Sequence, residues 1–204
     1  MRIERFSDLA EEILRRPARL GRVRVVAVDG PAGSGKSTFA GRLAAALRDK
    51  GSTVAVIHTD DLLEGWADMV SFWPRLSEWI IEPLRRGEPA RYRAYDWHRG
   101  RFADDWRTVP VPEVLLIEGV TSARAAAAPF LTLAVVVDAP APLRLARGLE
   151  RDGEELRDNW LRWMADEDRH FAADRTVARA DVIIDGAPEA PHDPETEYVR
   201  RAAG

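Results

Sequence analysis

The residues with the most specific chemical spacing lie between positions 30 and 38. The segment GPAGSGKST fits the pattern G-x-x-x-x-G-K-[ST], with an apolar run before it and a helical pattern after it. Its glycines let backbone N–H groups turn inward around a polyphosphate, and the following helix directs its positive dipole end at the same anion. We therefore predict an ATP site with Mg²⁺ as second cofactor, in which Lys36 reaches the outer phosphates and Ser37 binds the metal. The phosphate-binding residues expected are Gly30, Ala32, Gly33, Ser34, Gly35, Lys36, Ser37 and Thr38.

The basic composition separates Lys36 from the other cations. Of 30 basic side chains among 204 residues, only Lys36 and Lys50 are lysine. A compact ammonium suits the outer phosphates better than a planar guanidinium. Lys50 precedes Gly51 at an expected helix end, where a surface charge complements the helix dipole.

The composition also excludes several classes of protein. The chain has no cysteine and four scattered histidines, so disulfides, zinc sites with cysteine ligands and thiol nucleophiles are excluded. A net charge of −4 provides no global basic field, so we expect no nucleic-acid partner. No apolar segment approaches the length of a membrane span. We expect a soluble, cytoplasmic protein without a membrane partner.

Apolar runs alternate with helical patterns along the chain. Near-continuous hydrophobicity is typical of strands in a parallel sheet that is covered on both faces. The expected strands are Val23–Asp29, Thr53–His58, Val114–Glu118, Leu131–Asp138 and the weaker Asp181–Asp185. The expected helices are Lys36–Arg48, Met69–Arg86, Ala139–Arg151 and Glu154–Ala172. This order predicts an α/β fold, a doubly wound parallel five-stranded sheet with flanking helices.

Acidic residues end or follow the strands, where ligands bind in such sheets. Asp60 or Asp61 could accept the proton of an acceptor hydroxyl; we favour Asp60 as the base and Asp61 as a helix cap. Glu118 ends a strand as a carboxylate for the magnesium shell, either directly or through water. Small-molecule kinases also need arginines that neutralise the moving phosphoryl group. Three arginines at 144, 147 and 151 share one helix face.

Guanine-specific switch proteins usually carry an Asn-Lys-x-Asp box. The chain's single asparagine, Asn159, lies in a different context, in the segment NWLR. A GTPase is therefore disfavoured, although the P-loop alone does not distinguish ATP from GTP as donor.

From Val23 to about Gly186 the sequence resembles the uridine kinase family of P-loop nucleoside kinases. The matching segments are HTDDLL (58–63), AYDW (94–97), LIEG (116–119) and RLARGLERD (144–152), in the family order. The resemblance implies that Asp60 is the base, and that Glu118 supports magnesium. It further implies that Tyr95 and Trp97 flank the nucleoside, beside the carboxylate of Asp96 for hydroxyls, while Arg147 and Arg151 close over the phosphates.

The departures from the family pattern fall mostly on the acceptor side. Leu62 and Leu63 replace an aromatic pair, and Gly148 stands where the family tends to have arginine. The leading expectation is an ATP- and Mg²⁺-dependent kinase acting on the 5′-hydroxyl of uridine or cytidine. The alternatives are a kinase for pantothenate, a sugar or a sugar phosphate, and a P-loop ATPase or nucleotide sensor that acts through a protein partner.

The expected organisation is a single domain with short additions at both ends. Residues 1–22 form a helix packed on the domain, and residues 23–186 form the P-loop kinase domain. That domain includes an aromatic-rich acceptor insertion (62–112) and a lid at about 144–157. Residues 187–204 are expected to be a loosely ordered tail, and a homo-oligomer is left open.

Overall fold

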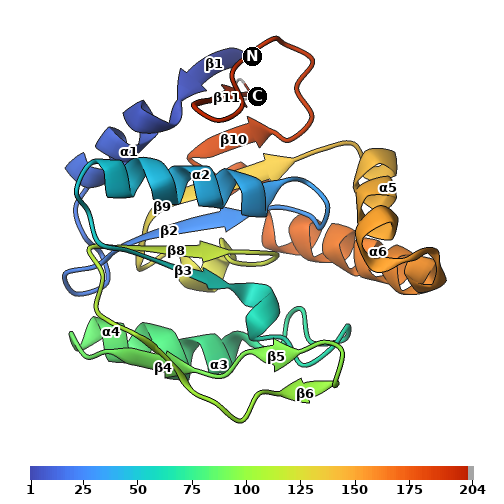
Figure 1. Cartoon of the computed structure of the whole chain (residues 1–204), viewed down its shortest axis with the longest axis horizontal. Helices are drawn as coiled ribbons and strands as arrows, with labels where there is room; N and C mark the ends of the chain where they lie inside the picture. Colours follow the sequence, from blue (N-terminus) through green and yellow to red (C-terminus); the bar gives the residue numbers. More distant parts are fainter. Residues whose placement is uncertain (202–204) are drawn as a thin grey trace.

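The computed structural model describes residues 1–201 and has a central seven-stranded sheet (Figure 1). The strand order is β1-β11-β10-β9-β2-β8-β3. The five strands from β10 to β3 are parallel, which confirms the predicted parallel sheet. These are β2 (Arg24–Asp29), β3 (Val54–His58), β8 (Val114–Glu118), β9 (Leu131–Asp138) and β10 (Val182–Asp185).

The two faces of the sheet are covered by different helices. In β2, Val26 and Val28 pack beneath α1 (Phe6–Arg15) and α2 (Lys36–Asp49), while Val25 and Ala27 face the opposite cluster. Period-two alternation therefore places apolar side chains on both faces, as expected of a buried strand. Figure 1 shows α1 and α2 on one side of the sheet and α3 and α4 on the other.

The insertion between β3 and β8 is one bent helical run followed by two short antiparallel ladders. The helix begins at Trp73, not at the predicted Met69, because Pro74 stands in its first turn, where proline is tolerated. A π-helical turn at Ser77–Ile81 bends it. The remaining elements here are the 3-10 turn η1 (Thr59–Asp61), α3 (Trp73–Leu76), α4 (Glu82–Arg85), β4 (Ala90–Tyr92), β5 (Tyr95–Asp96), β6 (Arg101–Phe102) and β7 (Arg107–Val109).

Two helices, α5 and α6, stand at the end of the sheet to which the arrows of β8 and β9 point (Figure 1). They are α5 (Ala141–Asp152) and α6 (Arg157–Asp174), with the turn Glu154–Leu156 between them. The short elements Ala125–Ala127 and α7 (Thr176–Arg179) complete the chain's helical turns. Within residues 1–201, no helix is long and apolar enough to cross a membrane.

The end of the chain differs from the expected loose tail. β11 (Glu197–Arg200) pairs antiparallel with β1 (Arg2–Arg5) and also with β10, so both ends of the chain extend the sheet. Tyr198 explains the docking, because its ring lies 5.2 Å from that of Phe6 and 5.4 Å from that of Phe39. The prediction of a loosely ordered tail at residues 202–204 falls outside the described part of the chain.

We expect Tyr198→Ala to lower the free energy of unfolding by about 3–5 kcal/mol, the range for truncating a large aromatic side chain in a core. Tyr198→Phe keeps the ring and removes only the hydrogen bond from the hydroxyl to Glu4 (2.8 Å), which costs about 1 kcal/mol. Urea unfolding of the two variants measures the difference. Equal stability of Tyr198→Ala and the unmodified protein would show that β11 is dispensable.

Candidate active site

The phosphate-binding loop connects β2 to α2 with a backbone that only glycine accommodates. Gly33 and Gly35 have φ angles of +76° and +97°. A Cβ atom at Gly30 would lie 2.0 Å from the carbonyl oxygen of Val137. The loop is thus shaped by close backbone packing on β9 and by left-handed turns.

Asp29, the last residue of β2, holds the start of this loop from inside the protein. Its carboxylate accepts hydrogen bonds from the backbone N–H groups of Gly30 (2.7 Å), Thr121 (2.9 Å) and Ala123 (2.8 Å). Complete burial raises the pKa of Asp29 to about 6, although the three donors and the charge of Lys36 favour the ionised form. Asp29 therefore joins the phosphate loop to the segment that follows β8.

A second carboxylate, Glu167 of α6, was missed by the sequence analysis. It is fully buried and accepts hydrogen bonds from the N–H of Ala32 (2.7 Å) and from the indole N–H of Trp163 (2.6 Å). Arg144 donates to its other oxygen at 3.2 Å. Glu167 comes 135 residues after Ala32, so no local motif connects the two residues. The one signal in the sequence is that an acidic residue stands on the same helix face as Trp160 and Trp163.

The loop fits a nucleotide phosphate chain. Lys36 is buried at the start of α2, with its ammonium group 3.4 Å from the carbonyl oxygen of Pro31. Ser34 carries a buried hydroxyl that has no partner among residues 1–201. Ser37 and Thr38 are exposed in the first turn of α2, where N–H groups and the helix dipole favour an anion.

Glu118 lies beside Ser37, as a magnesium shell requires. Its Oε1 accepts a hydrogen bond from the Ser37 hydroxyl (3.0 Å), and its Oε2 lies 2.6 Å from Nδ1 of His58. Burial opposes ionisation, but the hydrogen bond to His58 and the charge of Lys36 outweigh it and lower the pKa of Glu118. The same hydrogen bond raises the pKa of His58. A hydroxyl and an ionised carboxylate are the oxygen ligands that Mg²⁺ takes beside phosphates, so these residues fit the metal.

Asp60 follows the carboxyl end of β3, in η1, and is exposed. The charges of Lys36, Glu118 and Arg151 act on its carboxylate, and we call the space between these side chains the Asp60 crevice. Among residues 1–201 its carboxylate has no hydrogen-bond partner. Desolvation by the surrounding protein raises the pKa of Asp60, and Lys36 and Arg151 oppose this shift by their charge. Because Asp60 is exposed, its carboxylate can exchange protons with solvent although its pKa is raised.

Asp61 does not cap a helix, contrary to our expectation. No side-chain cap occurs at η1, and the Asp61 carboxylate instead accepts hydrogen bonds from the hydroxyl of Tyr92 (3.2 Å) and from Arg107 (3.1 Å). The partners come from β4 and β7, so the contact depends on the folded insertion. Asp61 is engaged in holding that insertion, while the Asp60 carboxylate remains open.

The three arginines that share a face of α5 have three different roles. Arg144 is buried and pairs with Glu167, so it is not part of a mobile lid. Arg147 donates to the carbonyl oxygens of Gly33 and Gly186, both at 3.1 Å. Only Arg151 is exposed, paired with Asp152 at 2.7 Å and close enough for its charge to act on Asp60.

The packing of α5 also explains the unusual Gly148. A Cβ atom there would lie 2.4 Å from the Trp160 ring. The indole of α6 therefore occupies the space that a side chain at position 148 would need.

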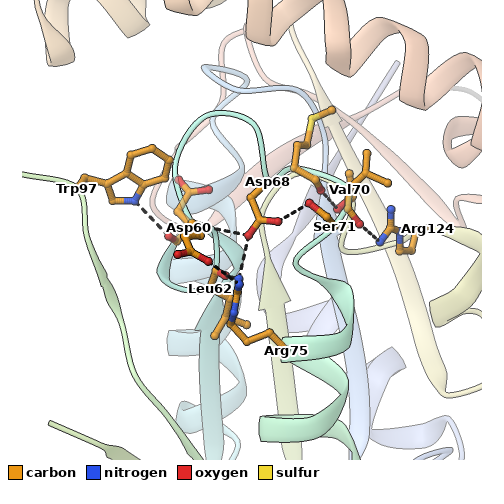
Figure 2. Close-up of polar contacts among 11 residues, drawn as sticks. Asp60, Leu62, Asp68, Val70, Ser71, Arg75, Trp97 and Arg124 are labelled. Atoms are coloured by element: carbon orange, nitrogen blue, oxygen red, sulfur yellow. Dashed lines mark hydrogen bonds and ion pairs between the residues drawn. The ribbon is translucent and has the colours of Figure 1, made fainter. Parts of the chain in front are cut away.

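Of the expected acceptor residues, Trp97 lies next to Asp60 (Figure 2). The indole N–H of Trp97 donates to the backbone oxygen of Asp60 (3.1 Å). The Tyr95 ring meets the Trp97 ring at 5.4 Å. Asp96 accepts hydrogen bonds from the N–H groups of His98 and Arg99, both at 3.0 Å. Trp97 and Tyr95 can thus face a ligand, whereas one oxygen of Asp96 closes the hairpin turn.

The loop after Asp60 is closed by an ion pair, Asp68 with Arg75 (Figure 2). Asp68 accepts hydrogen bonds from Arg75 and from the N–H of Glu64, both at 2.8 Å, and from the hydroxyl of Ser71. Arg75 also donates to the carbonyl oxygen of Leu62. These contacts fix the loop that carries Trp66 between the crevice and α6.

Comparison with known proteins supports the fold. The family model of the methylmalonyl Co-A mutase-associated GTPase MeaB matches residues 2–62, the segment that contains the phosphate loop. No curated protein matches the sequence.

Three solved structures are similar over most of the chain. A possible uridine kinase from Bacillus stearothermophilus has a TM-score of 0.66 and 24% identity, over 87% of this chain and 96% of that one. A putative fructose transport system kinase from Silicibacter sp. TM1040 has a TM-score of 0.62 and 20% identity, over 83% and 94%. D-Glycerate 3-kinase from Cryptococcus neoformans has a TM-score of 0.60 and 14% identity, over 95% and 99%. The chain therefore has the fold of the P-loop kinases.

We expect Glu167→Gln to weaken nucleotide binding and to destabilise the protein by about 1–3 kcal/mol, because an amide cannot accept all the donors that meet the carboxylate. A fluorescent ADP analogue measures the dissociation constant, and urea unfolding measures the stability. Asp168→Asn removes a charge from an exposed position on the same helix and should change neither quantity. Unchanged nucleotide affinity in Glu167→Gln would mean that the Ala32 contact does not shape the loop.

Proposed function

We propose that the protein is a kinase that transfers the γ-phosphoryl group of ATP to a hydroxyl of a small molecule. One observation carries the proposal: an open carboxylate, Asp60, shares a crevice with the residues suited to phosphates and magnesium. The indole of Trp97 lies next to Asp60 and donates a hydrogen bond to its backbone oxygen. A nucleotide switch without a second substrate does not require an open carboxylate at this place.

Each residue of the crevice has a defined task in this proposal. Asp60 accepts the proton of the acceptor hydroxyl, for which its position at the strand end and its raised pKa are suitable. Lys36 stabilises negative charge on the outer phosphates, and the N–H groups of the loop orient them. Arg151 is exposed and pairs with the neighbouring Asp152. Of the three arginines of α5 it is the one that can approach the transferred group from solvent, since Arg144 is buried and Arg147 binds the carbonyl oxygens of Gly33 and Gly186.

Ser37 and Glu118 would hold the magnesium ion, and the loop from Gly30 to Thr38 would hold the phosphates of ATP. When bound, ATP supplies the phosphoryl group and Mg²⁺ neutralises charge on its oxygens. His58 holds one oxygen of Glu118 at 2.6 Å and thereby fixes the orientation of the carboxylate toward Ser37.

The acceptor is not selected by the fold. The three similar structures are a possible uridine kinase, a putative fructose transport system kinase and a D-glycerate 3-kinase. The 5′-hydroxyl of uridine or cytidine, which the sequence motifs favour, is one member of the class we propose.

A GTPase is the second candidate, because of the match between residues 2–62 and the MeaB family model. The match ends at Leu62, just after η1, and therefore includes only the first residue of the acceptor insertion (62–112). Asn159, the one asparagine available for guanine recognition, lies on α6 and accepts a hydrogen bond from Arg162. Acceptor-independent hydrolysis of GTP in preference to ATP would favour this candidate.

An ADP-release screen at fixed ATP and Mg²⁺ tests the proposal. The panel comprises nucleosides, pantothenate, monosaccharides, sugar phosphates and hydroxy acids. The proposal requires that at least one acceptor stimulates ADP release. Equal rates with every compound and with none would contradict it.

We expect Asp60→Asn to reduce acceptor-dependent turnover by about 10²–10⁴-fold, the usual contribution of a general base. Nucleotide affinity should remain, because no hydrogen bond joins the Asp60 side chain to the phosphate loop and the substitution keeps its size. Steady-state kinetics and ADP-analogue titration separate the two effects. Lys36→Ala provides the contrast, since it should lose phosphate stabilisation and turnover together. Full activity of Asp60→Asn on every acceptor would disprove the assignment of the base.

The pH dependence of kcat/KM should show the raised pKa of Asp60. A base works only when ionised, so activity should fall as the pH drops through the raised pKa, at a higher pH than an ordinary aspartate would give. Arg151→Gln removes a cation that opposes the shift, so the acid limb should move to still higher pH. Movement of the limb to lower pH would contradict the proposed electrostatic effect.

A further inference from the structure

Four indole rings meet beside the Asp60 crevice, with Trp66 at their centre. The ring of Trp66 lies 5.8 Å from Trp97, 6.3 Å from Trp160 and 5.8 Å from Trp163. The interplanar angles are 74°, 69° and 84°, so all three pairs are edge-to-face. In such a pair the edge of one ring covers the face of the other, so no open slot for a flat base lies between the rings.

Hydrogen bonds fix the three outer indoles. The N–H of Trp97 donates to the backbone of Asp60 (3.1 Å), that of Trp160 to Asp152 (3.1 Å) and that of Trp163 to Glu167 (2.6 Å). Binding of a nucleobase by stacking requires an open aromatic face. Because the outer rings are held, only displacement of Trp66 could open one inside the cluster.

Trp66 also stands between Trp97 and a cavity of 310 Å³. Trp66 lines the cavity with other loop residues and with residues of α6, and Trp97 is not among them. The remaining lining residues are Ala67, Met69, Val70, Asp166, Arg169 and His170. Removing the indole would therefore join the space beside Trp97 to this cavity.

Three arginines of the acceptor insertion are paired with carboxylates, whereas Arg91 and Arg93 lie over the Trp106 ring. Arg75 binds Asp68 (2.8 Å), Arg107 binds Asp61 (3.1 Å) and Arg99 lies 3.5 Å from Asp96. An anionic acceptor would compete with these carboxylates for its counter-ion. The carboxylate of Asp60 adds negative charge to the crevice, which further disfavours a second anion.

Amide groups that could read a base edge are almost absent. The chain contains no glutamine, and its one asparagine, Asn159, is bonded to Arg162. Carboxylates, in contrast, suit the hydroxyls of a sugar.

From this geometry we infer that the acceptor is a neutral polyhydroxyl compound no larger than a monosaccharide, and that Trp66 sets this size limit. The inference rests on the proposed kinase function, and it selects a neutral sugar-sized acceptor over a nucleoside and over an anionic acceptor. Trp66 is a specificity-determining residue: its indole fills the space that the base of a nucleoside would occupy.

Kinetics on matched acceptors tests the inference. The unmodified protein, Trp66→Ala and Trp66→Phe are assayed with ribose, fructose, uridine, cytidine, glycerate and ribose 5-phosphate. The unmodified protein should prefer ribose or fructose to uridine by at least tenfold in kcat/KM. Trp66→Ala should raise the ratio of uridine to ribose by about 10–200-fold, the range that pocket size provides. Trp106→Ala is the control. It removes an exposed indole from the loop between β6 and β7 and should leave the ratio unchanged.

The outcomes distinguish failure of the inference from failure of the kinase proposal. If the unmodified protein prefers uridine, glycerate or ribose 5-phosphate, the inference is wrong and the kinase proposal stands. The same holds if Trp66→Ala folds and its ratio of uridine to ribose in kcat/KM is unchanged. If Trp66→Ala does not fold, Trp66→Phe must show a smaller change in the same direction. If no compound stimulates ADP release, the kinase proposal fails. In that case the dissociation constants of ribose and uridine, measured by quenching of tryptophan fluorescence, test the size limit. Equal dissociation constants would overturn it.

Discussion

The fold depends on holding open a loop that cannot stabilise itself. A phosphate-binding loop directs its own N–H groups inward, toward a ligand, so its conformation must be fixed by other parts of the chain. The carboxylate of Asp29 accepts a hydrogen bond from the N–H of Gly30, the first glycine of the loop, and that of Glu167 on α6 accepts one from the N–H of Ala32. Arg147 holds the carbonyl oxygen of Gly33 from α5. The loop is thus preorganised by charged side chains that point at its backbone.

The need for such support explains why the arginines of α5 differ in their surroundings. Helical periodicity correctly places residues 144, 147 and 151 on one face, but it does not reveal what that face meets. Arg144 meets the buried Glu167, Arg147 meets the phosphate loop, and Arg151 faces solvent beside the crevice. Of the three, only Arg151 is exposed to solvent, so only its guanidinium can meet a ligand from outside the protein.

Much of the fold and part of the candidate site could be predicted from the sequence, because their signals are local. The five parallel strands are continuous apolar runs, and the phosphate loop is a contiguous motif between a strand and a helix. The edge strands β1 and β11 were missed because each is four residues long and mostly polar on its exposed side. Asp61 was misjudged for a similar reason, since Arg107 lies 46 residues further along the chain. Glu167 and Trp66 act only through contacts made in the folded protein, so the residues near them in the sequence do not predict which partners they contact.

These long-range contacts join the two halves of the site through one helix. Trp163 of α6 meets Trp66 of the acceptor loop at 5.8 Å and donates its indole N–H to Glu167. Glu167 in turn receives the N–H of Ala32 in the phosphate loop. Trp66 in the loop after Asp60 and Ala32 in the phosphate loop are therefore joined through two residues of α6, by the packing of Trp163 and by the hydrogen bonds of Glu167.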